Sequence, residues 1–268
     1  MYVERPPTDD LAGRVACVWH QVSEADATQL VVPDACVDLI WGPEGLFVAG
    51  PDTGPMPTPM ASGDTFVGIR FRPGAAGGFF GVPLQDLRDQ RVPLSDLPSL
   101  GDQRVRATDP LSLHDQRVRV SDLPSLRDQQ PVQVSDLPPR RVADAAAPGR
   151  LDVMLAAVRD RLAREVPADP AGAAIAGALR KGRTVGEVAW DLGFSERQLH
   201  RRSLSAFGYA PKILQRIVRF QRALTLARAG VPLAEVAVTA GYADQAHLSH
   251  DVKRLSGVSM RHLVSSAG

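Results

Sequence analysis

Two stretches in the C-terminal third of the chain combine arginine, histidine and glutamine at the spacing of one helix face. The residues are Arg197, His200 and Arg201 in the first stretch and Gln245, His247 and His250 in the second. Arginine can donate two hydrogen bonds to a guanine, glutamine suits adenine, and histidine can donate or accept. These six side chains are therefore candidates for reading the edges of bases in duplex DNA.

Five further basic residues lie in or near these stretches and are better suited to binding phosphates. They are Arg202, Lys212, Lys253, Arg254 and Arg261. Contacts to phosphates position a protein on a duplex without reading its sequence. For each of these residues taken alone, a solvated surface position is the alternative.

Local signals place the first stretch on the second helix of a helix-turn-helix. Thr184 starts a capping box that begins a helix over 185–192, and Gly193 ends that helix. Ser195, with Gln198 three residues later, then forms the capping box of the next helix. Two short helices joined by a tight glycine turn are typical of this motif.

A second helix-turn-helix follows in the same order. Pro232 opens one helix, Gly241 ends it, and Asp244 caps the next one. Between the two units, residues 211–229 carry one apolar face and predict a single helix of about 30 Å. Because one turn of DNA is about 34 Å, the two polar helices could enter successive major grooves on one side of a duplex.

The net charge of +1 hides a strong asymmetry along the chain. Residues 1–86 contain 4 Arg and Lys against 11 Asp and Glu, and residues 87–179 contain 13 of each kind. Residues 180–268 contain 14 Arg and Lys against 6 Asp and Glu, a net charge of +8. Concentrated positive charge is typical of a polyanion binder, because each neutralised phosphate releases counterions. The basic end also carries the two polar helices.

Short runs of β-branched and aromatic residues between turn signals predict a compact β-rich domain over residues 1–86, a sandwich or a barrel. The expected strands are 15–21, 30–32, 36–41, 46–49 and 65–71. Residues 51–64 contain so much proline and glycine that we expect a surface loop there.

Some polar and aromatic residues of this domain could line a pocket for an effector. Arg70 and Arg72 alternate with apolar residues, so they share a face and could receive an anionic or planar ligand. The other candidates for lining such a pocket are Trp19, His20, Asp38 and Trp41. Ion pairing of the arginines with carboxylates, and packing of the other four in the core or its rim, are the alternatives.

A 13-residue unit occurs four times between positions 87 and 139, with one extra residue in the last copy. The units are nearly identical, which indicates duplication of one segment. We therefore expect one unit to pack on the β-rich domain and the others to form an extended excursion. Residues 140–170 should hold a connecting helix with one apolar face, followed by a hinge.

The second helix-turn-helix resembles the AraC/XylS family of bacterial transcription regulators. The residues that carry the resemblance are Gly241, Tyr242, Asp244, Leu248, Lys253, Arg254, Gly257 and Ser259. The chain departs from the family pattern at four places: His250 stands where Arg is frequent, Ser203 and Val252 where Phe is usual, and Met260 where Pro is usual. The resemblance implies a DNA-binding domain over residues 171–268, preceded by a sensor or dimerisation domain.

Segments 33–41 and 68–75 resemble an N-terminal domain that some members of this family carry. The partners that the resemblance implies are duplex DNA, RNA polymerase, a small-molecule effector and a second copy in a homodimer. We expect no cofactor and no membrane partner. No apolar run approaches the roughly 20 residues that span a bilayer, and the first ten residues lack the features of a signal peptide, so a cytoplasmic location is expected.

An enzyme is the rival interpretation, because DNA alkyl-repair methyltransferases can carry the same kind of helix-turn-helix domain. Such enzymes need a cluster of zinc-binding cysteines, whereas this chain has only Cys17 and Cys36, and no metal site is expected. A protein-interaction module with secondary DNA contact is a third interpretation. Our prediction is a non-enzymatic α+β protein, with a β-rich sensor-like domain followed by an all-α double helix-turn-helix domain.

Overall fold

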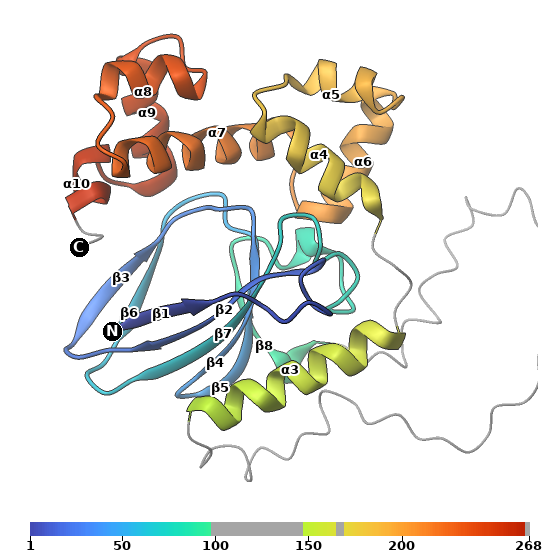
Figure 1. Cartoon of the computed structure of the whole chain (residues 1–268), viewed down its shortest axis with the longest axis vertical. Helices are drawn as coiled ribbons and strands as arrows, with labels where there is room; N and C mark the ends of the chain where they lie inside the picture. Colours follow the sequence, from blue (N-terminus) through green and yellow to red (C-terminus); the bar gives the residue numbers. More distant parts are fainter. Residues whose placement is uncertain (98–146, 165–168, 266–268) are drawn as a thin grey trace, which may run out of the picture.

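The computed structural model describes residues 1–97, 147–164 and 169–265 of the 268-residue chain (Figure 1). Strands dominate residues 1–96 and helices the remainder, so the predicted α+β class is confirmed. The last three repeat units, residues 140–146 before the connecting helix, and residues 165–168 of the expected hinge lie outside the described residues. No helix within the described ranges is long and apolar enough to cross a membrane.

The β-rich part consists of a six-stranded antiparallel sheet and a separate two-stranded ribbon. The sheet has the order β1-β2-β7-β4-β5-β8, and the ribbon pairs β3 with β6. The strands are β1 (Tyr2–Arg5), β2 (Val15–Val22), β3 (Ala27–Val31), β4 (Val37–Gly42), β5 (Gly45–Ala49), β6 (Met56–Met60), β7 (Thr65–Phe71) and β8 (Arg91–Pro93).

The two faces of the six-stranded sheet have different roles. Leu39 and Trp41 of β4 pack into an apolar core together with Met154 and Val158 of α3 (Ala147–Arg164). Figure 1 shows α3 lying along this side of the sheet. Residues at the alternate positions of β4 point to the opposite face, because side chains along a strand alternate. That opposite face is the floor of a cavity described below.

Two parts of the β region differ from the sequence-based expectation. The segment 51–64 is not an irregular loop throughout, because β6 pairs with β3 inside it. The prolines of β6, Pro57 and Pro59, occupy alternate positions. Both can therefore lie where a backbone N–H would point to the unpaired edge of the ribbon, so the pairing with β3 loses no hydrogen bond. Strand β1 was not anticipated. β8 pairs with β5 and belongs to the first repeat unit, so that unit packs on the sheet as expected for one copy.

The C-terminal part is built of helices, and the five from α5 to α9 begin and end within about a residue of the bounds that the local signals predict. They are α4 (Pro170–Arg180), α5 (Val185–Asp191), α6 (Glu196–Phe207), α7 (Pro211–Arg228), α8 (Leu233–Ala240), α9 (Gln245–Ser256) and α10 (Met260–Ser265). Both capping boxes, at Thr184 and at Ser195, are formed. Gly208 and Gly257 close α6 and α9 with φ angles of 77° and 76°, in the left-handed region that favours glycine.

The helix α7 connects the two ends of the helical part and also contacts the β-rich part. Figure 1 shows α7 running across the top of the β-rich part, with α4, α5 and α6 at one end and α8, α9 and α10 at the other. The side-chain amide of Gln221 donates a hydrogen bond to the carbonyl oxygen of Pro33 at 2.6 Å. Ala35, in the same loop, is buried in the core of the helical part. The two parts therefore share contacts through the loop between β3 and β4.

Candidate functional site

The helix α6 presents its polar residues to solvent because its apolar residues anchor the opposite side. Leu199 is buried, whereas Arg197, His200 and Arg201 are all exposed. The hydroxyl of Ser195 accepts from the backbone N–H of Gln198, which fixes the start of the helix beside these residues. The three predicted readers of this helix thus share one accessible surface. Arg201 also borders a cavity of about 400 Å³ between α6 and segment 78–85.

The helix α9 repeats this arrangement with different chemistry. Leu248 and Val252 are buried, and the predicted readers Gln245, His247 and His250 are exposed. The backbone N–H of His247 donates to the Asp244 carboxylate at 2.7 Å. The Nδ1 atom of His247 accepts from the backbone N–H of Ala243 at 3.4 Å, so a neutral ring carries its proton on Nε2 and can donate from there.

Four of the five predicted phosphate ligands are exposed, and the fifth has internal partners. The exposed residues are Lys212, Lys253, Arg254 and Arg261. Arg202 is half-buried, forms an ion pair with Asp169, and lies 4.7 Å from the ring centroid of Phe194. Its guanidinium therefore holds α6 against the start of α4 and is less available to a phosphate than the other four groups.

The second helix-turn-helix contains an ion-pair cluster that sequence reasoning missed. Asp251 of α9 is buried and accepts from Arg219 of α7 at 2.9 Å, with Arg216 at 3.4 Å. The guanidinium of Arg219 lies 4.1 Å from the ring centroid of Tyr242. Burial raises the pKa of the Tyr242 hydroxyl to about 12. This cluster fixes α9 against α7, so it sets the direction in which α9 presents its polar face.

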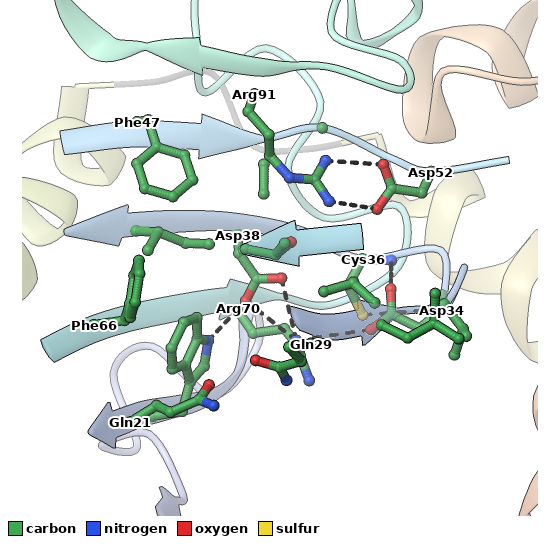
Figure 2. A pocket seen from close by; sticks show the side chains of 18 of the residues that line it. Gln21, Gln29, Asp34, Cys36, Asp38, Phe47, Asp52, Phe66, Arg70 and Arg91 are labelled. Atoms are coloured by element: carbon green, nitrogen blue, oxygen red, sulfur yellow. Dashed lines mark hydrogen bonds and ion pairs between the residues drawn. The ribbon is translucent and has the colours of Figure 1, made fainter. Parts of the chain in front are cut away.

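A separate cavity of about 610 Å³ lies on the free face of the six-stranded sheet. The ribbon formed by β3 and β6 provides one wall, and α7 contributes Gln221, Leu224 and Arg228. Figure 2 shows the charged and aromatic side chains that line it. The aromatic residues among them are Tyr2, Trp19, Phe47 and Phe66. A pocket of this size and mixed lining is typical of a small-molecule site.

The polar centre of this cavity is an arginine surrounded by carboxylates. The Nε of Arg70 donates to Asp38 at 3.2 Å and lies 3.7 Å from Asp34, while its Nη1 lies 3.6 Å from Glu4. The indole N–H of Trp19 also donates to Asp38, at 2.9 Å. Burial raises the pKa of the Asp38 carboxyl, and the nearby guanidinium limits that rise. Figure 2 shows Asp38, Asp34 and Arg70 converging from different strands and the adjoining loop.

A second ion pair and a glycine shape the rest of the cavity. Arg91 of β8 forms a two-bond pair with Asp52, with distances of 2.9 and 2.8 Å (Figure 2). Gly68 leaves room for the indole of Trp19, because a Cβ at that position would lie 2.1 Å from the Cε2 atom of Trp19. The indole can therefore lie against the sheet beside the Arg70 cluster.

The structure brings together only part of the pocket suggested by the sequence. Trp19, Asp38 and Arg70 line the cavity. Trp41 instead packs in the core on the other face of the sheet, and His20 lies on that other face of β2 because it alternates with Trp19. Arg72 follows the end of β7, where its Nε donates to the carbonyl oxygen of Ala12 at 2.7 Å.

Several lining residues were not identified from the sequence. Arg91 comes from the first repeat unit and Asp52 from the proline-rich segment 51–64. The helix α7, in the C-terminal part of the chain, supplies Gln221, Leu224 and Arg228. Only the alternation of Asp38 with Leu39 and Trp41 signalled that β4 has one polar-lined face. Cys17 and Cys36 are free thiols, and burial raises the pKa of Cys17 to about 11. No group of three or more potential metal ligands occurs within the described ranges.

Comparison with known proteins identifies two regions of the chain. Residues 3–93 match a family described as a domain of unknown function, DUF6597, and residues 188–265 match the family described as a helix-turn-helix domain. No curated protein sequence matches the chain.

Two solved structures are among those that the chain matches. The C-terminal domain of AraT, a response regulator from Geobacillus stearothermophilus, is 24% identical over 37% of this chain and 86% of its own, with a TM-score of 0.34. A variant of ToxT from Vibrio cholerae in its apo form is 11% identical over 92% of this chain and 96% of its own, with a TM-score of 0.45.

Proposed function

We propose that this chain is a DNA-binding transcription regulator of the AraC type and that α6 and α9 enter successive major grooves on one side of a duplex. The observation that carries the proposal is the pair of exposed polar faces on these two helices. The 18-residue helix α7 separates them and is about 27 Å long. This length suits the roughly 34 Å between successive major grooves.

The exposed side chains divide into two roles in this proposal. The base readers are Arg197, His200, Arg201, Gln245, His247 and His250. The phosphate ligands are Lys212, Lys253, Arg254 and Arg261, with a smaller contribution from the paired Arg202. Arginine can bind guanine through two hydrogen bonds, so α6 supplies stronger discrimination than α9, whose readers are glutamine and histidine.

The β-rich domain acts in this proposal as the sensor of a small-molecule effector. The support is the cavity on the free face of the sheet, because α7 lines it as well. An effector in this cavity would contact the helix that connects the two DNA-reading units. Occupancy and DNA affinity would then be linked, since a ligand shifts an equilibrium when it binds two states unequally. Contacts with RNA polymerase and with a second copy of the chain complete the proposed set of partners.

Genome-wide footprinting followed by gel shifts tests the DNA-binding proposal. Protection of specific sites is expected, and replacing Arg201 by Ala should weaken binding to such a site by about 1 to 3 kcal/mol and relax the base preference at one position. Arg88→Ala, on the β-rich domain, is the matched control and should leave the affinity unchanged. Unaltered binding of the Arg201→Ala protein to its site would remove the assignment of Arg201 as a base reader.

A further inference from the structure

We propose that the cavity between the sheet and α7 binds a small amphipathic organic cation, an amine carrying an aromatic or alkyl body. The inference rests on the sensor role proposed above and names the chemical class of the effector. Its basis is the combination of an unbalanced cluster of carboxylates, four aromatic rings and an apolar wall in one cavity.

The charge balance inside the cavity favours a cation. Arg70 contacts three carboxylates: those of Asp34 and Asp38, which line the cavity, and that of Glu4, which lies beside it. Glu44 and Arg228 also line the cavity. The lining holds four carboxylates, from Asp34, Asp38, Glu44 and Asp52, against the guanidinium groups of Arg70, Arg91 and Arg228, and Glu4 adds a further negative charge at the Arg70 cluster. The other buried pair, Arg91 with Asp52, is matched one to one and adds no net charge. A cation at the Arg70 cluster would offset the uncompensated negative charge, whereas an anion would have to displace a carboxylate.

The aromatic rings of the cavity reinforce this preference. The faces of aromatic rings carry negative charge and attract ammonium and guanidinium groups. Tyr2 and Trp19 lie next to each other, with ring centroids 5.9 Å apart, beside the carboxylate cluster. Phe47 and Phe66 line the same cavity and, with Ile40 and Leu224, offer an apolar surface for the body of the ligand. Such a site would hold the charged group at Asp38 and the body along the sheet.

The loop between β3 and β4 connects the carboxylate cluster to α7. One oxygen of Asp34 accepts from the backbone N–H of Cys36 at 2.8 Å, and the other faces Arg70. The neighbouring Pro33 accepts the hydrogen bond from Gln221 of α7. Ala35 has a φ of 67°, unusual for a residue with a side chain, and is buried against the helical core. A cation that draws the Asp34 carboxylate would therefore act on a strained loop packed against α7.

Calorimetric titration of the full chain without DNA tests the ligand class. The probes are 4-phenylbutylamine and 4-phenylbutyrate, which share an aromatic body and carry opposite charges. At neutral pH we expect the amine to bind at least about tenfold more tightly than the acid. Equal or tighter binding of the acid would overturn the proposal. Absence of amine binding at about 1 mM would overturn it as well.

Substitutions in the carboxylate cluster locate the bound amine. Asp38→Asn and Asp34→Asn keep the side-chain shape and remove one negative charge each, so each should weaken amine binding by about tenfold. Asp9→Asn removes the same charge from an exposed position outside the cavity and is the matched control. If Asp38→Asn fails to fold, Asp34→Asn decides the question. Amine binding that is unchanged in the folded variants would overturn the proposal. Because these titrations contain no DNA, failure of DNA binding would refute the regulator proposal separately.

Discussion

At the scale of residues, each helix-turn-helix unit contains an aromatic ring, an arginine and a carboxylate in contact. The two units differ in which helix supplies the arginine and which supplies the carboxylate. The aromatic residue after each turning glycine, Phe194 or Tyr242, packs under an arginine that is paired with a carboxylate. In the first unit the arginine is on α6, one of the two helices proposed to read DNA. In the second unit the reading helix α9 supplies the carboxylate instead, from Asp251. The first pairing fixes α6 to the start of α4, and the second fixes α9 to α7.

The second pairing should contribute measurably to stability. Replacing Asp251 by Asn leaves Arg219 half-buried without an ionised partner, so we expect the free energy of unfolding to fall by about 2 kcal/mol. Asp191→Asn is the matched control, because its pair with Arg183 is exposed and should contribute less than about 1 kcal/mol. Urea denaturation of both variants measures the difference. Equal losses would show that the Asp251 cluster has no special role.

At the scale of elements, each reading helix owes its position to the residues at its ends. Ser195 and Gln198 form reciprocal bonds at the start of α6, and Asp244 caps α9. These groups satisfy N–H donors that have no partner inside a helix. The caps also fix which residues begin the helix and therefore which side chains face outward.

Removing the cap of α6 should destabilise the domain without touching a base reader. Ser195→Ala is expected to lower the free energy of unfolding by about 1 kcal/mol, because the backbone N–H of Gln198 loses its acceptor. Ser205→Ala, at an exposed position in the last turn of the same helix, should cause no loss because alanine favours helix formation. Thermal denaturation distinguishes the two. A loss in Ser205→Ala as large as that in Ser195→Ala would argue against a capping effect.

The C-terminal half of α9 should bind DNA without reading its sequence. Lys253 is exposed and follows the reading residues along the helix. Lys253→Ala is therefore expected to weaken binding to every duplex alike and to reduce the salt dependence of the binding constant by about one. Titrations at several salt concentrations with specific and random duplexes measure both effects. A loss confined to the specific duplex, with an unchanged salt slope, would contradict the assignment.

At the scale of the whole molecule, α7 belongs to two sites at once. It separates the two helices proposed to read DNA, and its residues Gln221, Leu224 and Arg228 face the cavity of the β-rich domain. The loop around Ala35 adds a second contact between the two parts. A ligand that alters the packing of α7 would alter the relative placement of α6 and α9.

This arrangement predicts reciprocal linkage between effector and DNA. Saturating specific DNA should change the affinity for 4-phenylbutylamine by about fivefold or more, and the amine should change the affinity for DNA by the same factor. Calorimetry with and without the duplex measures the first factor, and gel shifts with and without the amine measure the second. The same amine affinity in free and DNA-bound protein would exclude coupling through α7.

The sequence by itself determined the features that depend on near neighbours in the chain. Capping boxes at Thr184 and Ser195, turning glycines, and the outward faces of α6 and α9 all follow from spacings of three or four residues. Both helix-turn-helix units and their exposed polar side chains could therefore be predicted. The positive charge of residues 180–268 was likewise a property of composition alone.

Only the tertiary structure decided which distant residues meet. Trp19 and Trp41 are equally aromatic, yet one lines the cavity and the other fills the core, because each strand turns a different set of side chains to each face of the sheet. The pairing of the proline-bearing β6 with β3, and the contribution of α7 to the cavity, also depend on contacts between remote segments. Local patterns specify helices and their ends, whereas a pocket is formed by the packing of elements that local patterns cannot place.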